Sequence, residues 1–371
     1  MMARLSAALD RRWLTNNGPL VQEFEARVAE IAGVPHAVAM CNATIALQVL
    51  LRALNLSGEV ILPSFTFVAT AHTVEWEGLT PVFADVDPIT HNLDPEKVEA
   101  LINPRTVAIL GVHLWGRPCA VDALTATAER HRLHLIFDAA HAIGCTSRGR
   151  PLGSFGDAEV FSFHATKAVH AVEGGAVVTA NGALAERLRK MRNFGFAGFD
   201  RVVSLGTNAK MHEFSAATGL CSLEEFPQVS ETNRRTQESY RAGLTGVPGI
   251  DVIRYPAGES HNNHYVVADI HPDCPLTRDE LVRVLAAENV VARRYFFPGC
   301  HRMEPYSIRY PFWDKTLPVT NGLVHRLLVL PNGTAAEPAA VDRICDVVRA
   351  AVAAAPAVRA GLRAADQSRA A

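Results

Sequence analysis

The sequence predicts an α/β fold in which a large domain with a mostly parallel, doubly wound sheet is followed by a smaller α+β domain. Three observations support this prediction. The chain has 371 residues and is 49% hydrophobic, which suits one large core and a second, smaller one. Between about residues 20 and 180, short apolar runs alternate with segments of helical periodicity, as in sheets with helical crossovers. After about residue 225 this alternation ends.

The elements of the alternating region follow in order. Residues 24–33 (FEARVAEIAG) predict a helix, and residues 36–40 (HAVAM) predict the first strand. The next helix, residues 44–54, places its apolar side chains on one face. Asp94 and Pro95 are typical of a helix N-cap and a first helical position. Further strands are predicted at residues 59–63, 80–86, 106–114 and 133–138, and further helices at residues 93–102 and 121–132.

The later part of the chain predicts a second, smaller unit. Residues 231–244 (ETNRRTQESYRAGL) indicate a helix that leads out of the large domain. Two apolar runs, 264–270 and 327–333, and the helical pattern of 277–290 between them favour an α+β arrangement. We therefore expect an N-terminal arm and large domain in residues 1–230 and a small domain in residues 231–371. The last dozen or so alanine-rich residues are expected to be frayed.

Composition excludes several classes of function. The formal net charge is −2 and the lysines and arginines form no block, so neither a nucleic acid nor a membrane surface is expected as a partner. No apolar run approaches the length of a membrane helix, and no secretory signal is evident, which predicts a cytoplasmic protein. There is no Cys-x-x-Cys or His-Glu-x-x-His, so no metal is expected. The nucleotide-binding glycine motifs are also absent.

Three places stand at expected strand ends, where open α/β sheets bind ligands. The amides of Ala43 and Thr44 begin a helix and can bind an anion. Asp138 follows a buried apolar strand, and Lys167 with Ser162 lies between two apolar stretches. Taken singly, each has an ordinary explanation: a helix cap for the first two places and a solvated surface lysine for the third. Together, a phosphate site, a carboxylate and a half-buried lysine match the needs of pyridoxal phosphate (PLP).

Longer motifs add a resemblance that covers nearly the whole chain. The sequence includes LTNNGPLVQEFE, CNATIALQ, LPSFTFVATAHTV, VHLWGRPCAVDAL, FDAAHAIG, FSFHATK before EGGAVVT, GTNAKMHEFSAATGL and ARRYFFPGCHRMEPY. In these stretches it resembles the sugar aminotransferases of the DegT/DnrJ/EryC1/StrS family. The resemblance implies fold type I of the PLP-dependent transferases, the aspartate aminotransferase fold. Its large domain has a mostly parallel seven-stranded sheet, and a smaller C-terminal α+β domain follows.

The resemblance implies roles for single residues. Lys167 is similar to the lysine that forms a Schiff base with PLP and moves the proton between the substrate carbon and the cofactor. Asp138 matches the acid that pairs with the pyridine nitrogen, and His141 matches the position near the 3-oxygen. Phe67 matches the aromatic residue that stacks on the ring, although by spacing alone it indicates plain core. We expect Lys167 and Asp138 to be the catalytic residues.

Phosphate contacts and subunit structure follow in the same way. Ala43 and Thr44 match backbone phosphate donors, and Ser162 matches a side-chain donor. Asn208, which by itself indicates only a turn, matches a residue that reaches the phosphate in the neighbouring subunit. The resemblance thus implies a homodimer with shared active sites.

The substrate is expected to be a nucleotide-linked keto-sugar. The first choice is a dTDP-4-keto-6-deoxyhexose, converted to the 4-amino-4,6-dideoxy sugar with glutamate or glutamine as amino donor. Amination at C3 is the near alternative, and a PLP-dependent sugar dehydratase or a non-catalytic homologue ranks lower, since a dehydratase carries histidine in place of the lysine. Tyr295, Phe296, His301 and Arg302 are candidates for the sugar-nucleotide cleft. No clear arginine pair for a dicarboxylate amino donor is evident, and Arg293 and Arg294 are candidates for that role by residue type alone.

Overall fold

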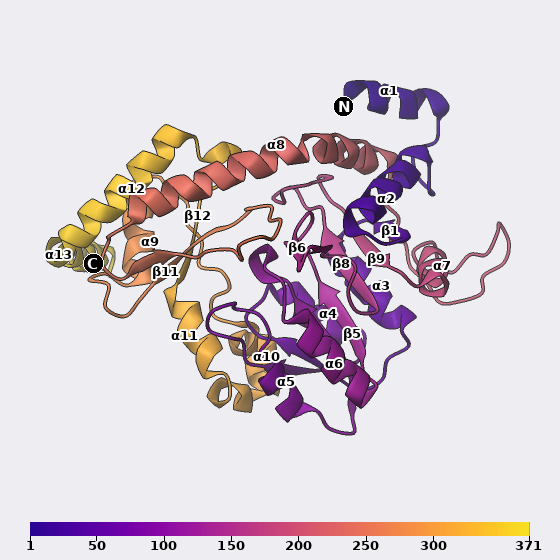
Figure 1. Ribbon diagram of the computed structural model, residues 1–371, viewed down its shortest axis with the longest axis horizontal. Coiled ribbons are helices and arrows are strands. Elements are labelled where there is room, and N and C mark those ends of the chain that lie inside the picture. Colours follow the sequence, from indigo (N-terminus) through magenta and orange to yellow (C-terminus); the bar gives the residue numbers. More distant parts are fainter. Residues whose placement is uncertain (371) are drawn as a thin grey trace.

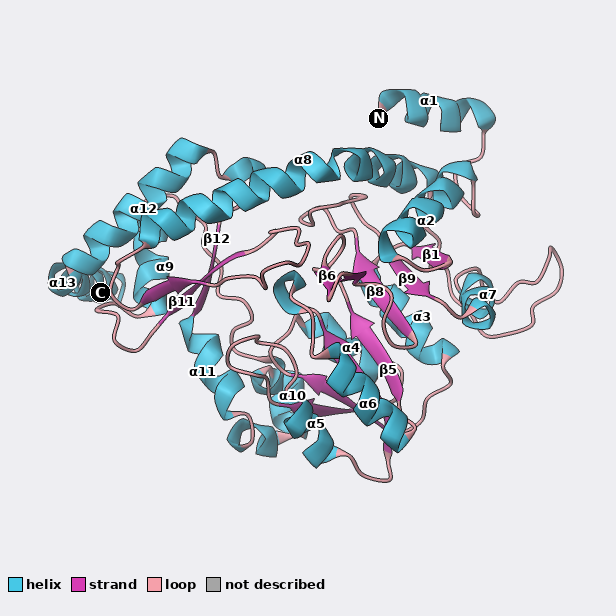
Figure 2. Ribbon diagram, viewed as in Figure 1, coloured by secondary structure: helices cyan, strands magenta, loops and turns pink. Residues whose placement is uncertain are grey.

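The structure, a computed structural model, describes residues 1–370 and is organised by one large sheet (Figures 1 and 2). This sheet has seven strands in the order β1-β9-β8-β5-β4-β2-β3. The strands are β1 (His36–Met40), β2 (Glu59–Pro63), β3 (Thr80–Ala84), β4 (Thr106–Val112), β5 (His134–Asp138), β8 (Ala158–Ser162) and β9 (Gly175–Thr179). All pairings in it are parallel except the two made by β9. The prediction of a mostly parallel sheet is confirmed.

Reversal of β9 has a direct effect on the site. Because β9 runs against both neighbours, its first residue, Gly175, lies at the carboxyl ends of β1 and β8. There it pairs with Met40 on one side and Ser162 on the other. Ligands of open α/β sheets collect at this edge. The glycine pair seen in the sequence is therefore part of the ligand-binding edge of the sheet.

Helices cover both faces of the sheet. Those of the first 200 residues are α1 (Met2–Arg11), α2 (Pro19–Ala32), α3 (Ala43–Ala53), α4 (Val68–Trp76), α5 (Pro95–Leu101), α6 (Val121–His131) and α7 (Gly182–Met191), with a short 3-10 turn η1 (Leu114–Gly116). The carboxylate of Asp94 accepts a hydrogen bond from the Glu96 amide, which confirms the predicted cap. The sequence analysis did not single out α4, because its buried residues are largely threonine and alanine and form no apolar stripe.

Helix α8 (Glu213–Leu244) is much longer than the predicted helix of residues 231–244. Figure 1 shows it running from the large sheet to the small one, packed against α2 near its start and against α12 near its end. Glu213, at its first turn, is fully buried and accepts the Leu20 and Val21 amides at 3.0 Å each. The first half of α8 therefore packs within the large domain. The predicted helix, which was based on apolar periodicity alone, did not include this half.

A second core forms around a three-stranded antiparallel sheet in the order β10-β11-β12. Its strands are β10 (Ile250–Val252), β11 (Val266–Ile270) and β12 (Leu327–Leu330), and the adjoining helices are α9 (Arg278–Ala287), α11 (Pro318–Arg326), α12 (Pro338–Ala353) and α13 (Ala355–Ala370). The intervening residues 300–317, with η2 (Cys300–Arg302), α10 (Glu304–Arg309) and η3 (Pro311–Lys315), instead pack on the core of the large sheet. A domain boundary near residue 230 stays a prediction.

The C-terminal segment differs from its expected frayed form. It is helical through Ala370 as α13, while residue 371 lies outside the described residues. Two ion pairs join α13 to α9: Arg283 to Asp366 at 2.6 Å and Arg359 to Glu280 at 3.1 Å. Ala355 is buried against the small-sheet core. These contacts are made with a helix some 80 residues earlier in the chain. The apolar periodicity of the C-terminal segment alone therefore did not predict them.

In the described residues, no helix is both long and apolar enough to cross a membrane. All seven cysteines are free thiols.

Candidate active site

Lys167 lies in the turn that follows β8, at the carboxyl edge of the sheet. Its side chain is half-buried, and its Nζ donates a hydrogen bond to the Tyr265 hydroxyl at 3.1 Å. Burial lowers the pKa of Lys167 to about 8, against the opposing effects of Asp138 and Tyr295. A neutral amine is the nucleophilic form, so this environment supplies it near neutral pH.

Asp138 ends β5 and is buried. One carboxylate oxygen accepts the Ala140 amide at 3.0 Å, and the other accepts the Thr70 hydroxyl at 2.8 Å. Burial raises the pKa of Asp138, while these two hydrogen bonds act in the opposite direction. A cation placed against this carboxylate, such as a protonated ring nitrogen, would offset the cost of burying its charge.

His141 presents a neutral ring beside these groups. Its Nδ1 accepts the Trp115 amide at 3.2 Å, so its proton is on Nε2, which is left as a donor. Burial lowers the pKa of His141 well below its usual value, and Lys167 lowers it further. The rings of Trp115 and Tyr265 pack against it, with centroids at 6.1 and 4.5 Å.

The start of α3 is a candidate anion site. The Asn42 side chain accepts the Ile45 amide at 2.9 Å, and among the described residues the amides of Ala43 and Thr44 have no acceptor. A Cβ on Gly175 would lie 2.4 Å from the Ala43 nitrogen, so only glycine lets the helix come this close to β9. Ser162, the residue paired with Gly175, adds a hydroxyl at the same edge. Two amides, a hydroxyl and a helix N-terminus fit a phosphate.

Phe67 is an exposed aromatic residue next to this group. It is 59% exposed, and its carbonyl accepts the Thr70 amide at 3.1 Å. Phe67 therefore lies one helical turn before Thr70, whose hydroxyl donates to the Asp138 carboxylate. An exposed ring there is available to stack on a planar ligand.

Asn208 belongs to a different segment, which runs close to the start of α3: the carbonyl of the next residue, Ala209, accepts the Cys41 amide at 2.8 Å. Asn208 is exposed and forms a β-bridge with Asn193. The 194–205 segment between these two residues projects from the large sheet beyond α7 (Figure 1). Within the described part of the chain the Asn208 side chain makes no hydrogen bond or ion pair.

The four candidates for the cleft occupy different environments. Tyr295 and Phe296 stack on each other, and the Tyr295 ring centroid lies 6.3 Å from that of Tyr265. His301 is 2% exposed, with Nδ1 on the Ser64 hydroxyl at 2.6 Å and Nε2 on Asn321 at 3.0 Å.

The side chain of Arg302 pairs with Asp314 at 2.5 Å. The structure thus gives His301 and Arg302 partners within the chain and brings only the two aromatic residues toward Lys167.

Two site residues escaped the sequence analysis. Tyr265 precedes β11, nearly a hundred positions after Lys167, and no local pattern indicates the contact. Thr70 follows Phe67 by three residues, so a helix starting in FTFVAT would have placed both on one face. That spacing was the available signal.

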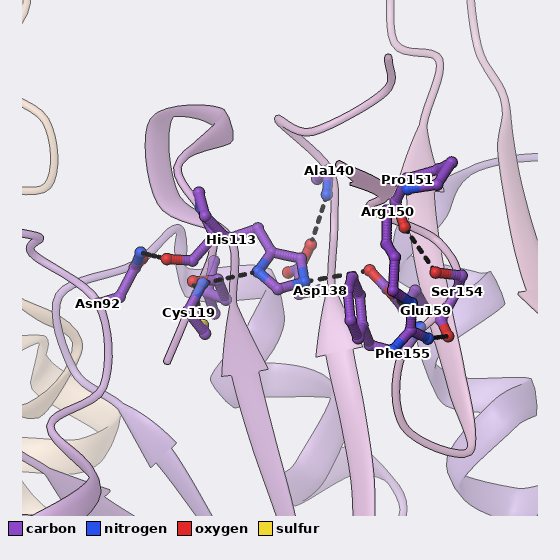
Figure 3. A network of polar contacts seen from close by, with 12 residues as sticks. Asn92, His113, Cys119, Asp138, Ala140, Arg150, Pro151, Ser154, Phe155 and Glu159 are labelled. Atoms are coloured by element: carbon purple, nitrogen blue, oxygen red, sulfur yellow. Dashed lines mark hydrogen bonds and ion pairs between the residues drawn. The ribbon is translucent and has the colours of Figure 1, made fainter. Parts of the chain in front are cut away.

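A buried polar network supports the strand that carries Asp138 (Figure 3). His113 accepts the Cys119 amide at its Nδ1 at 3.0 Å, and its Nε2 lies 3.1 Å from a Glu159 carboxylate oxygen. Both side chains are fully buried, and the His113 ring stacks on Phe137 with centroids 4.6 Å apart. The His113 amide donates to the Asp138 carbonyl at 3.0 Å. The network therefore fixes the backbone that aims Asp138.

Glu159→Ala is expected to lower the free energy of unfolding by about 3–5 kcal/mol, because it leaves the Phe155 amide and His113 without their buried acceptor. Urea titration of the cofactor-free protein would measure the change. The matched control is Glu129→Ala, which removes an exposed carboxylate and should change stability by less than about 0.5 kcal/mol. Equal stability of the two variants would show that the network contributes little.

The fold and the site together define a class. A mostly parallel seven-stranded sheet with a lysine, an aspartate and an anion site at its carboxyl edge has the architecture of the fold type I aminotransferases. The chain belongs to the DegT/DnrJ/EryC1/StrS aminotransferase family, whose profile matches residues 1–349.

Individual relatives agree with this membership. The dTDP-4-amino-4,6-dideoxy-D-glucose transaminase of Shigella dysenteriae is 40% identical over 293 residues, which are 79% of this chain and 80% of the relative. The enzyme of the same name from Escherichia coli is 34% identical over 333 residues, 89% of each chain.

Among solved structures, DesI in the presence of its TDP-sugar product is 51% identical, with a TM-score of 0.92, covering 98% of this chain and 92% of that one. The DesV structure from S. venezuelae, in complex with a ketimine intermediate, is 33% identical with a TM-score of 0.88, and covers 94% of this chain and 93% of that one.

Proposed function

We propose that this chain is a PLP-dependent aminotransferase that converts a dTDP-4-keto-6-deoxyhexose to the 4-amino-4,6-dideoxy sugar, with glutamate or glutamine as amino donor. The observation that carries the proposal is the Lys167 amine, half-buried beside Asp138 and with its pKa lowered to about 8. The names of the relatives support dTDP-linked substrates and the C4 position. C3 amination is the alternative that the assay below separates.

The residues at the sheet edge fit PLP. The amides of Ala43 and Thr44 and the Ser162 hydroxyl would hold its phosphate, where Gly175 leaves the room. Asp138 would bind the ring nitrogen, and the His141 Nε2–H would donate to the 3-oxygen. Phe67 would cover one face of the ring. When bound, PLP supplies an aldehyde that carries the amino group and a ring that accepts electrons.

Each protein group then has a definite task. Lys167 would attack as the neutral amine and, once free, take and return a proton at the substrate carbon. Tyr265 holds the lysine amine in place from the other sheet. Asp138, anchored by Thr70 and Ala140, would keep the ring nitrogen protonated, which is the state in which the ring withdraws electrons best.

The proposal is tested by incubating the PLP-loaded protein with glutamate and a set of dTDP-linked keto-sugars. We expect a 4-amino-4,6-dideoxy product, identified by mass and NMR. The free sugar should react with a kcat/KM at least about 100-fold lower, because nucleotide binding helps to position the ketone. Preference for the 3-keto isomer would move the reaction to C3. Turnover of simple 2-oxo acids alone would reject sugar-nucleotide amination.

We also propose a homodimer with shared active sites. Large apolar side chains are exposed on the 194–205 segment and on α4, notably Phe199 (98%), Leu205 (81%) and Trp76 (77%). Exposed apolar clusters of this kind usually meet a partner. Asn208 follows this segment and has an uncommitted side chain, which would suit a contact to the partner's phosphate.

Mixing Lys167→Ala subunits with Asn208→Asp subunits should restore activity. If sites are shared, one site of each mixed dimer has both its lysine and its asparagine, and the other site has neither. Random exchange then predicts roughly one quarter of wild-type activity, since half the dimers are mixed and each has one good site. Native mass spectrometry would verify the exchange. Mixed dimers without activity would place both residues in the same subunit's site.

A further inference from the structure

A cavity of about 310 Å³ lies between the start of α4 and the 293–297 segment. Phe67, Arg293, Arg294, Tyr295 and Phe296 line it, together with three apolar residues and Thr66. Neither Asp nor Glu is among its lining residues in the described part of the chain. Among the described lining residues, the charged groups are the two guanidinium groups of Arg293 and Arg294.

This cavity adjoins the candidate active site. Phe67 forms part of its wall and stands one turn from the Thr70 that binds Asp138. On the other side, Tyr295 is close enough to Lys167 to raise the pKa of the lysine. The ring centroid of Tyr295 lies 6.3 Å from that of Tyr265, whose hydroxyl accepts a hydrogen bond from the lysine amine. A molecule whose reacting carbon is at Lys167 can therefore extend past Tyr295 into the cavity.

The two arginines are not equivalent. Arg294 pairs with Asp279 at 3.3 Å and stacks on Phe297. Arg293 lies over the Tyr295 ring at 5.1 Å and, among the described residues, its guanidinium makes no ion pair or hydrogen bond. Arg302, one of the residues predicted for the sugar-nucleotide cleft, is paired with Asp314 and does not line the cavity.

We propose that this cavity binds the diphosphate of the nucleotide-linked substrate and that Arg293 is its main contact. This inference rests on the proposed function. A planar guanidinium matches two phosphate oxygens at once, and one held over an aromatic ring loses little freedom on binding. A diphosphate could form ion pairs with both arginines, with the unpaired guanidinium of Arg293 and with that of Arg294, which Asp279 partly neutralises. An amino donor's carboxylate is the other anion that could use the same chemistry, and the experiment separates the two.

The test is calorimetric titration of dTDP into the PLP-loaded protein and into Arg293→Gln. We expect dTDP affinity to fall about 10–100-fold in the variant. Thymidine, which lacks phosphates, should bind equally well to both proteins, and the KM for glutamate should not change. Arg302→Gln is the matched control, with the same substitution outside the cavity, and should bind dTDP within about twofold of wild type.

Arg293→Lys is a second variant that distinguishes a loss of binding from misfolding. Lysine keeps the positive charge but lacks the planar guanidinium that can bind two phosphate oxygens at once. This variant should bind dTDP with intermediate affinity at an unchanged melting temperature. Unchanged dTDP affinity in Arg293→Gln, or an equal loss in Arg302→Gln, would overturn the proposal. A raised KM for glutamate with unaltered dTDP binding would assign the cavity to the donor instead. If wild type aminates no nucleotide sugar, the function fails; if it does and Arg293 has no effect, only the subsite fails.

Discussion

Lys167→Ala should have no measurable transaminase activity and no covalent link to PLP. Lys167 is the amine among the candidate site residues named above, and its lowered pKa makes it reactive near neutral pH. Alanine also removes the amine proposed to move the proton at the substrate carbon. Borohydride reduction followed by mass spectrometry would show the PLP adduct in wild type and its absence in the variant.

The fold should tolerate this change, because the amine makes one side-chain hydrogen bond, to Tyr265, and the turn is held by backbone contacts. Lys97→Ala, which removes an exposed lysine on α5, is the control and should keep full activity and the adduct. A reducible adduct that persists in Lys167→Ala would assign the cofactor lysine elsewhere.

Asp138→Asn should lower kcat by at least about 100-fold while PLP is retained. The amide oxygen can still accept from Thr70 or Ala140, so the local structure is kept. It carries no charge, however, and cannot hold a protonated ring nitrogen as a carboxylate does. Because the phosphate contacts proposed for Ala43, Thr44 and Ser162 are separate from Asp138, the cofactor should survive gel filtration.

Absorbance after gel filtration measures retention, and single-turnover kinetics measure the chemical step. Asp122→Asn, on the exposed side of α6, is the control and should be fully active. If Asp138→Asn turns over at close to the wild-type rate, the carboxylate has only a structural role, accepting the Ala140 amide and the Thr70 hydroxyl. The helix cap that the sequence left open as the ordinary explanation is not found, because residues 139–145 form turns and no helix.

The sequence predicted best what depends on neighbours in the chain. Strand β2 matches the predicted residues 59–63, and the Asp94 cap and the carboxyl-terminal ends of α2 and α3 also follow local rules. The start of α2 was missed, since it begins at Pro19 and not at residue 24. The ligand-binding edge could be predicted because parallel strands all end there. These features need only periodicity, caps and strand ends.

Contacts between distant segments could not be predicted in this way. Tyr265, just before β11 of the small sheet, is hydrogen-bonded to Lys167. His301 is buried, where its ring is hydrogen-bonded to the Ser64 hydroxyl. Arg302 and Arg293 look alike in the sequence, and only the position of Asp314 shows that one is committed and the other is free. Residue type identified the candidates, but tertiary pairing distinguishes them.

The reversed strand β9 also makes the lysine segment a closed loop. Residues 163–174 leave β8 and return to the same edge, where the Phe163 amide donates to the Gly174 carbonyl at 2.8 Å and Ser162 pairs with Gly175. Closing a loop of this length reduces chain entropy, and here the loss occurs during folding rather than on ligand binding. The amine is thereby preorganised: a cofactor would meet a lysine in a loop whose two ends are already joined by the large sheet.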